Sequence, residues 1–453
     1  MFDLHSFYTI YKLKKLISSA GRAKPPRDFI PQKGNFLYVP ASCLPFHISG
    51  YTNRTHEILK SLKAGFDSHN TAHPDDPRKL FVLTRTGYPW DRRDSLEYPD
   101  SESNVIDGIR YDHIRTPKNS ILTAMYAAEA SKRIEEYIIK NRISCVHAAS
   151  NHVNALPALI AAKRLGIPFQ YEMRGIWELT RISRNPKFEK SHNFKLGLNL
   201  EAMVATNADK VFVISEQLSE YIINNWKVSP SVIRLLPNCA DVDIIKPEDA
   251  APNEGRTDNS SETGANDSLT GRSAITIVYA GSLIVYEGIQ TLLKALSVLV
   301  HDEHLPVRLE ILGDGEYRKA LEQLSAELRL ENHVFFLGRV TPVEAKRKQD
   351  GCSLVCIPRE PFEVCRIVPP IKLVEAMAKE KCVIVPDLPV FRDELGLGDS
   401  GCLFFKSGDY HDLALVLKEN IYDADGLREK GRRARQYVID HRQWNQFTKE
   451  VYS

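Results

Sequence analysis

Short apolar runs alternate with longer amphipathic segments along most of the chain. Short apolar runs bounded by turn residues are typical of buried strands, and longer amphipathic segments are typical of helices. This alternation predicts parallel sheets that helices cover on both faces. We expect strands at 35–40, 79–84, 143–147, 169–173 and 210–214, and again at 274–280, 307–312, 334–337, 354–357, 382–385 and 402–404. We expect helices at 52–64, 121–140, 155–165 and 195–208, and again at 289–301, 317–328 and 370–379.

One segment interrupts this alternation. Residues 248–273 are polar, rich in Gly, Ser, Asn and Asp, and contain no aromatic residue. Such a composition cannot bury enough apolar area to fold, so we interpret the segment as a flexible linker. The chain is therefore expected to form two doubly wound α/β domains, 35–247 and 274–435. Ligands of such folds bind outside the carboxyl ends of the strands, in the cleft.

Composition and charge narrow the possible functions. The 453 residues carry a net charge of only +2, which argues weakly against nucleic acid as the main partner. The eight cysteines form no C-x-x-C pair and no cluster with histidine, so neither a zinc site nor a disulfide framework is indicated. Their position in apolar runs favours a reducing, cytoplasmic location.

The first 34 residues form a basic extension. They hold seven basic and two acidic residues, a net charge of +5, among many apolar and aromatic side chains. No apolar stretch here or elsewhere reaches the roughly 18 residues of a membrane span, and lysines interrupt any signal-peptide core. Two interpretations stay open for the extension. It is either a helix that packs on the first domain or a segment that docks on an anionic membrane surface.

The segment 368–378, VPPIKLVEAMA, carries the strongest chemical signal. Its prolines open a helix, so the N–H groups of Ile371, Lys372 and Leu373 form an anion site together with the helix dipole. Lys372 adds a positive charge, and Glu375 lies beside it on the helix surface, where it could accept hydrogen bonds from a ribose diol. The alternative is an ordinary surface pair of Lys372 and Glu375.

Glycine turns follow two strands of the second half. Gly281 and Ser282 follow the strand at 274–280, and Gly313 and Gly315 follow the strand at 307–312. Glycine at a strand end allows a phosphate or a sugar ring to approach the backbone. The alternative is that both are ordinary turns.

Polar residues also follow the strands of the first half, at the edge where a ligand is expected. A pair of Glu172 and Arg174 that only braces the rim is the alternative, and a lone histidine is more often structural than functional. The candidates are Gly50, Tyr51 and Arg54 after the first strand, His147, Asn151 and His152 around the third, and Glu172 and Arg174 at the end of the fourth.

Together these stretches resemble glycosyltransferase family 4, from about residue 36 to the end of the chain. The second half matches through YAGSLIVYEGIQTLLKAL, LEILGDGEYRKAL, HVFFLGRV, PPIKLVEAMAKEKCVIV and GCLFFKSGD, in the order and spacing of the family. The first half, through GYTNRTHEILKSL, VLTRTGYPWDR and ALPALIAAKRLGIPFQYEMRGIWE, is similar to a bacterial branch that builds capsular or exopolysaccharides.

The resemblance implies the GT-B fold, with two Rossmann-like domains facing a central cleft and a last helix, about 436–453, that returns to the first domain. It implies transfer with retention, without a metal or other cofactor, from a UDP- or GDP-linked sugar to a glycan or lipid-linked acceptor. It also implies a cytoplasmic enzyme, with the basic extension as a possible contact to the inner face of the membrane.

The same resemblance implies roles for individual residues. Lys372 and the adjacent N–H groups would hold the diphosphate, Glu375 the ribose, and the turn with Arg339 and Val340 the base. The acceptor would enter near His147, Asn151, His152, Glu172 and Arg174. The residues expected to be catalytic are Lys372, Glu375, His147 and Glu172. A nucleotide-sugar epimerase, a sugar phosphorylase and a non-catalytic binding subunit are the alternatives.

Two departures from the family pattern affect the donor site. The first of two glutamates that the family usually carries is replaced by Ile367, so Glu363 or Arg366 would have to contact the donor sugar. Ser282 and Glu287 stand where many members have an Arg and a Lys for the diphosphate. Diphosphate binding would then depend on Lys372, the helix N-terminus and either Arg366 or Arg339.

Overall fold

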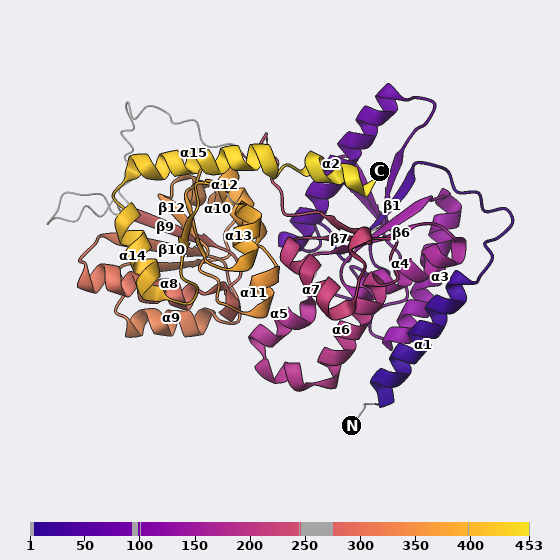
Figure 1. Cartoon of the computed structure of the whole chain (residues 1–453), viewed down its shortest axis with the longest axis horizontal. Coiled ribbons are helices and arrows are strands. Elements are labelled where there is room, and N and C mark those ends of the chain that lie inside the picture. Colours follow the sequence, from indigo (N-terminus) through magenta and orange to yellow (C-terminus); the bar gives the residue numbers. More distant parts are fainter. Residues whose placement is uncertain are drawn as a thin grey trace. The chain divides into compact units, whose positions relative to one another are not determined.

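A computed structural model describes residues 4–92, 98–99, 101–243, 245, 275–396 and 398–452. The segment expected as a linker, 248–273, lies outside the described residues. The chain divides into two compact units, one of residues up to Asn238 together with those from Trp444 onward, and one spanning Cys239–Gln443. Each unit contains a parallel sheet of six strands with helices packed around it (Figure 1). The expected α/β class, with two doubly wound sheets, is therefore confirmed.

The sheet of the first unit has the strand order β2-β1-β5-β6-β7-β8. Its central strands β5 and β6 are almost entirely buried, as expected for a sheet covered on both faces. The order reverses between β1 and β5, which is where a doubly wound sheet opens a crevice at its carboxyl edge. The strands are β1 Asn35–Val39, β2 Lys79–Val82, β5 Cys145–Ala149, β6 Phe169–Met173, β7 Lys210–Val213 and β8 Ile233–Leu235. An antiparallel hairpin, β3 Ser103–Ile106 and β4 Ile109–Asp112, adds to the unit.

The helices expected at 52–64, 121–140, 155–165 and 195–208 are present with shifted ends, whereas Trp177–Arg184 and Glu216–Trp226 are helices that the sequence pattern did not predict. The first of them after β1 begins at residue 50 rather than 52, because the Ser49 side chain caps it by accepting from the Thr52 N–H. The helices are α1 Leu4–Gly21, α2 Gly50–Ala72, α3 Thr123–Asn141, α4 His152–Leu165, α5 Trp177–Arg184, α6 His192–Ala205, α7 Glu216–Trp226 and α16 Trp444–Thr448.

The basic extension folds as α1, which packs against α3, α4 and α6 (Figure 1). One face of α1 is buried through Thr9, Leu13, Ile17 and Ala20. The other face leaves large apolar side chains in solvent, with exposed fractions of 84% for Leu4, 60% for Phe7, 55% for Tyr8 and 54% for Tyr11. No helix in the described part of the chain is long and apolar enough to cross a bilayer.

The sheet of the second unit has the strand order β11-β10-β9-β12-β13-β14. This is the order of a Rossmann sheet, with its reversal between β9 and β12. An apolar core from β9, β10 and the helices around them packs on the sheet. The strands are β9 Ile275–Ala280, β10 Val307–Leu312, β11 Val334–Gly338, β12 Leu354–Cys356, β13 Val383–Pro386 and β14 Leu403–Phe405.

The helices of the second unit include several that the sequence pattern did not predict. They are α8 Ile289–Ser297, α9 Arg318–Glu327, α10 Pro342–Asp350, α11 Glu363–Ile367, α12 Ile371–Ala378, α13 Pro389–Leu395, α14 Tyr410–Asn420 and α15 Ala424–His441.

The return to the first unit comes later than residue 436, where we expected it. The reason is that α15 packs along α12 as one continuous helix (Figure 1). Arg435 ties α15 to its own unit, since its guanidinium donates to the carbonyl oxygens of Ala378, of Ile245 at 2.7 Å and of Val242 at 2.9 Å. The chain therefore changes unit only at Trp444.

Candidate functional site

The loops after β9, β10 and β12 meet at the carboxyl edge of the second sheet. The Gly281 N–H donates to the Leu312 carbonyl at 2.9 Å. A Cβ on Gly313, whose φ is +141°, would collide with the carbonyl oxygen of Gly281, and one on Gly288 would collide with that of Pro358. Only glycine allows these backbones to approach so closely. The glycine turns expected here are therefore packed against each other, at the reversal of strand order.

Lys372, in the first turn of α12, reaches the turn that contains Gly281. Its Nζ donates to the Tyr279 hydroxyl at 2.9 Å and to Glu287 Oε2 at 2.5 Å, and it lies 4.2 Å from the centre of the Tyr279 ring. A Cβ on Gly281 would lie 2.9 Å from this Nζ. The structure thus brings together Lys372 and Gly281, which are far apart in sequence, beside the amino end of a helix.

A buried ion cluster surrounds this lysine. Glu287 accepts from Lys372 through Oε2 and from Arg359 Nη2 through Oε1, at 2.8 Å. Arg359 also donates to the Val368 carbonyl at 2.8 Å. Burial alone would raise the pKa of Glu287, but Arg359 and Lys372 outweigh it and lower that pKa to about 2. Burial lowers the pKa of Lys372, and Glu287 opposes this effect.

Arg359 and Tyr279 are site residues that the sequence analysis missed. The available signal was Glu287 itself. An acidic residue that is buried in the turn after a buried strand requires a cation next to it. Arg359 follows β12 and supplies that cation.

The remaining donor-site candidates of α11 and α12 lie close in sequence but differ in exposure. Glu375 is half-buried, one turn beyond Lys372 on α12. Glu363 and Arg366 are exposed on α11, and Ile367 is buried in the apolar interior. The replacement of a glutamate by Ile367 is thus accompanied by burial of that side chain. The expected anion site was assigned to the backbone N–H groups of Ile371, Lys372 and Leu373. Ile371 is the first residue of α12, and the Leu373 N–H donates to the Pro370 carbonyl at 3.2 Å.

Other candidates line the neighbouring turns. The Ser282 carbonyl accepts from the Tyr279 hydroxyl at 3.1 Å. A Cβ on Gly315 would collide with the Leu283 backbone. The Arg339 side chain is 83% exposed, 4.0 Å from an Asp314 oxygen, and Val340 beside it is half-buried. Within the described ranges, no group of three or more His, Cys, Asp or Glu is placed to hold a metal ion.

In the first unit, Glu172 lies at the centre of a buried network. Its carboxylate accepts from Arg174 Nε at 2.8 Å and Nη2 at 3.0 Å, and from the Tyr38 hydroxyl at 2.6 Å. His147 Nε2 lies 3.4 Å away. Burial would raise the Glu172 pKa, but Arg174, His147 and Arg54 hold it well below its ordinary value.

This network leaves its members little capacity for a ligand. Glu172 and His147 are at most 1% exposed. Arg174 donates to the Tyr51 carbonyl at 3.0 Å and Thr55 Oγ1 at 2.7 Å besides its bonds to Glu172 and Tyr38. The arrangement braces the carboxyl edge of the sheet from inside, which was the alternative interpretation of Glu172 and Arg174.

Arg54 extends the brace to the end of the unit. Its guanidinium donates to Glu172 Oε1 at 3.1 Å and to the carbonyl oxygens of Leu236 at 2.6 Å and Pro237 at 2.7 Å. It also lies 5.2 Å from the ring of Trp444, the first residue after the return. Arg54 therefore fixes the segments that enter and leave the first unit.

His152 belongs to a second polar cluster that the sequence did not reveal. Glu201 accepts from the His152 N–H at 2.8 Å, lies 3.0 Å from its Nδ1, and binds the Tyr171 hydroxyl with its other oxygen. Glu178 is buried beside them, and its Oε2 has no hydrogen-bond partner among the described residues. Burial and the nearby Glu201 raise the Glu178 pKa to about 7.

Gly50, Tyr51 and Asn151 lie at adjoining helix starts. Gly50 is the first residue of α2, and Asn151 caps α4 by accepting from the Val153 N–H at 3.3 Å. The Tyr51 hydroxyl donates to the Ser150 carbonyl at 3.0 Å. The structure therefore joins these candidates at the carboxyl edge, above the buried network.

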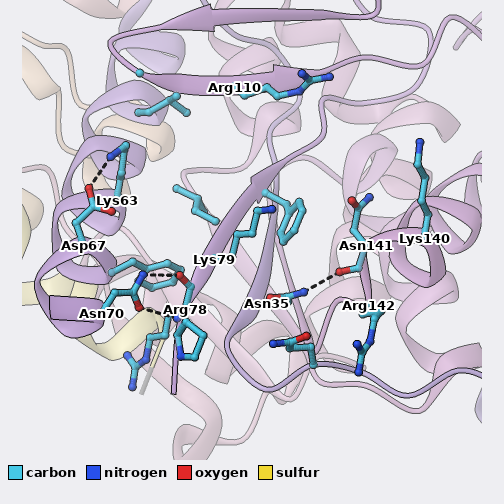
Figure 2. Close-up of a pocket in the computed structure, with 17 residues that line it drawn as sticks. Asn35, Lys63, Asp67, Asn70, Arg78, Lys79, Arg110, Lys140, Asn141 and Arg142 are labelled. Atoms are coloured by element: carbon cyan, nitrogen blue, oxygen red, sulfur yellow. Dashed lines mark hydrogen bonds and ion pairs between the residues drawn. The ribbon is translucent and has the colours of Figure 1, made fainter. Parts of the chain in front are cut away.

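A basic cavity of about 700 Å³ lies at the opposite, amino edge of the same sheet (Figure 2). Its lining includes six cationic side chains and one carboxylate, Asp67, which pairs with Lys63. Figure 2 shows Arg110, Lys140 and Arg142 pointing to different sides rather than to a common point. The cavity is thus positively charged, without a converging set of donors.

Two family models match the chain. Residues 49–239 match the glycosyl transferase 4-like domain, and residues 265–438 match glycosyl transferases group 1. A phosphatidylinositol N-acetylglucosaminyltransferase GPI3 subunit of Saccharomyces cerevisiae is 25% identical over 211 residues, 46% of this chain. That match covers 41% of the yeast protein, so the chain spans about two fifths of the length of this relative.

Solved structures share the fold over nearly the whole chain. Sucrose-phosphate synthase from Thermosynechococcus elongatus has a TM-score of 0.66 at 15% identity, covering 92% of this chain and 97% of that one. WaaG, a glycosyltransferase of lipopolysaccharide biosynthesis, has 0.62 at 13%, covering 92% and 98%. Anabaena HepE, solved with UDP, has 0.60 at 17%, with the same coverage of 92% and 98%. HepE has also been solved with UDP-glucose.

Proposed function

Since the chain is a glycosyltransferase of the GT4 type with the GT-B fold, we propose that it transfers a sugar from a UDP- or GDP-linked donor to a glycan or lipid-linked acceptor. The observation that carries this proposal is Lys372, held at the amino end of α12 beside the Gly281 turn. A helix N-terminus, a lysine and closely packed glycine turns together suit a diphosphate. The UDP and UDP-glucose complexes of HepE support the same kind of donor.

The reaction proposed is transfer with retention. The bond between the sugar C1 and the diphosphate oxygen breaks through an oxocarbenium-like state. The acceptor oxygen then bonds to C1 from the face that the diphosphate leaves, and its proton passes to a diphosphate oxygen. Lys372 and the helix N-terminus would stabilise the charge that develops on the diphosphate, which is commonly the largest protein contribution to such a step. No step requires a metal.

The remaining donor contacts follow from position. Glu375, one turn after Lys372, would accept hydrogen bonds from the ribose hydroxyls. The turn with Arg339 and Val340 would contact the base, and exposed Glu363 and Arg366 are available to the sugar.

The acceptor is proposed to contact the first unit. Gly50, Tyr51 and Asn151 would approach it directly, together with His152 at the start of α4. The buried network would not touch the acceptor but would hold the carboxyl edge of the sheet in place. Its members are His147, Glu172, Arg174 and Arg54. Their burial supports an indirect role.

The process proposed is capsular or exopolysaccharide synthesis at the inner surface of the cytoplasmic membrane. The exposed apolar face of α1, with Lys12, Lys14 and Lys15 on the same helix and no acidic residue, supports contact with an anionic lipid surface.

The test is a thermal-shift panel of UDP- and GDP-sugars, followed by transfer from the donors that bind. A ligand at 100 times its Kd adds about 2.7 kcal/mol to the stability of the folded state. The product's anomeric configuration, read by NMR, tests retention, and activity in excess EDTA tests metal independence. If no nucleotide sugar raises the melting temperature and none is consumed with any glycan acceptor, the proposal is wrong.

A further inference from the structure

We propose that Glu287 and Arg359 are positioning residues that hold Lys372 at the diphosphate site. The inference rests on the proposed donor site and assigns two residues to it. Neither has to touch the donor, because both act through Lys372.

The geometry is a chain of contacts that ends on Lys372. Arg359 is tied to the Val368 carbonyl, four residues before Lys372, and to one oxygen of Glu287. The other oxygen of Glu287 accepts from Lys372, and Tyr279 accepts from the same Nζ. Lys372 is therefore held from β9, from the turn after it and, through Arg359, from the loop after β12.

Hydrogen-bond capacity fits a ligand at this Nζ. A lysine ammonium carries three N–H groups. In the described part of the chain, Glu287 and Tyr279 accept two hydrogen bonds from it. The third N–H is available to a phosphate oxygen, while the other two fix the direction of the side chain.

The charges explain why an acid can stand at position 287. Lys372 and Arg359 together carry two positive charges and Glu287 one negative charge, so the buried cluster keeps a net charge of +1. Arg359 neutralises part of the charge of Glu287 through Oε1, so Lys372 can keep its bond to Oε2 and still attract a phosphate. Tyr279 also donates to Glu287 Oε2, at 3.2 Å, but it carries no charge. Without Arg359, Lys372 would be the one cation beside the buried Glu287 in the described part of the chain and would be retained against the ligand.

The experiment compares binding of UDP with UMP, and of GDP with GMP, by calorimetry in Glu287→Gln, Arg359→Gln and Arg359→Lys. If this pair positions Lys372, Glu287→Gln and Arg359→Gln each lower the affinity for the diphosphates by about tenfold or more. The affinity for the monophosphates falls much less. Arg359→Lys recovers part of the loss. A general structural defect would weaken both kinds of nucleotide alike.

The pH dependence gives a second measurement. Glu287 favours the charged form of Lys372, so Glu287→Gln should move the high-pH loss of UDP or GDP binding downward by about one pH unit or more. The double variant Glu287→Gln with Arg359→Gln removes the like charge as well and should move back toward the wild type. If either single variant does not fold, nucleotide binding by this double variant is measured in its place.

Glu394→Gln is the matched control, because Glu394 pairs with Arg442 in the same unit and is equally buried. It should lower stability without changing the ratio of diphosphate to monophosphate affinity. The inference would be overturned if the Glu287 and Arg359 variants fold, keep the wild-type ratio of diphosphate to monophosphate affinity, and lose UDP or GDP binding at the same high pH as the wild type. Failure of the wild type to bind any of these nucleotides would instead remove the proposed function on which the inference rests.

Discussion

Arg174 grips both oxygens of Glu172, with Nε 2.8 Å from Oε1 and Nη2 3.0 Å from Oε2. Both residues are buried, so the pair is shielded from solvent and from salt. If Arg174 is removed, Arg54 still pairs with Glu172, but the buried carboxylate loses two charged hydrogen bonds.

Arg174→Ala should therefore lower the free energy of unfolding by about 3–5 kcal/mol, as urea denaturation would measure. Arg133→Ala is the control, because Arg133 pairs with Glu136 on the exposed face of α3, where about 1 kcal/mol or less is expected. Equal effects of the two substitutions would contradict the buried brace.

The pair also shows what sequence alone could provide. The strand pattern correctly placed Glu172 and Arg174 at the carboxyl end of β6 and predicted that they could pair. It could not distinguish a pair on the surface from one beneath it, because that depends on Tyr38, Arg54 and His147, which other elements supply.

The donor side had the same limit. Apolar periodicity identified both sheets, and the glycine turns were found from their position after strands. The contact between Glu287 and Arg359 joins residues 72 positions apart. It exists only because the loop after β12 lies against the turn after β9. Helices α10, α11 and α13 are short, and α10 has few apolar residues, so periodicity gave no signal for them.

Gly313→Ala should destabilise the second unit strongly. A methyl group there would meet the Gly281 carbonyl at a φ of +141°, which adds a backbone collision to the strain of the conformation. Gly166→Ala is the control, with a φ of +65° and nothing within 4 Å of the new methyl group. Chemical denaturation should show a loss of unfolding free energy of about 1 kcal/mol for the control and a clearly larger loss for Gly313→Ala. A Gly313→Ala protein as stable as the control would show that the two loops do not pack as described.

Glu178 should make stability depend on pH. Its pKa is raised from 4.5 to about 7, so the folded state keeps a proton that the unfolded state releases. The stabilising contribution is complete below pH 4.5, declines as pH rises and is lost above about pH 7. Glu178→Gln removes this dependence. The variant should gain up to about 3 kcal/mol relative to the wild type between these limits, since one pKa unit corresponds to about 1.4 kcal/mol.

The measurement for Glu178 is the difference in unfolding free energy between variant and wild type at several pH values. Glu189→Gln is the control, because Glu189 is an exposed carboxylate shortly after α5. Its unfolding free energy should differ from that of the wild type by the same amount at every pH. A difference for Glu178→Gln that stays constant from pH 4.5 to 7 would contradict the raised pKa.

The exposed face of α1 should bind anionic vesicles. Phe7→Ser combined with Tyr11→Ser removes apolar area without disturbing the buried face, and should weaken co-sedimentation with phosphatidylglycerol vesicles by about tenfold or more. Leu122→Ser combined with Met125→Ser is the matched control, because both side chains are also more than half exposed. If the wild type sediments no more with phosphatidylglycerol than with phosphatidylcholine vesicles, α1 is not a membrane contact.

Lys372→Ala should reduce turnover by a factor on the order of 10² to 10³, by analogy with the loss of one donor from an oxyanion site. The reason is that the lysine would stabilise charge that is larger on the departing diphosphate than on the bound donor. The loss should therefore fall mainly on kcat rather than on KM. Lys379→Ala is the control, since it removes the same charge at the other end of α12, where Lys379 donates to Gln349 at 2.6 Å. A Lys372→Ala enzyme with near wild-type turnover would mean that the diphosphate departs against other groups, and the assignment of α12 as the donor site would have to be abandoned.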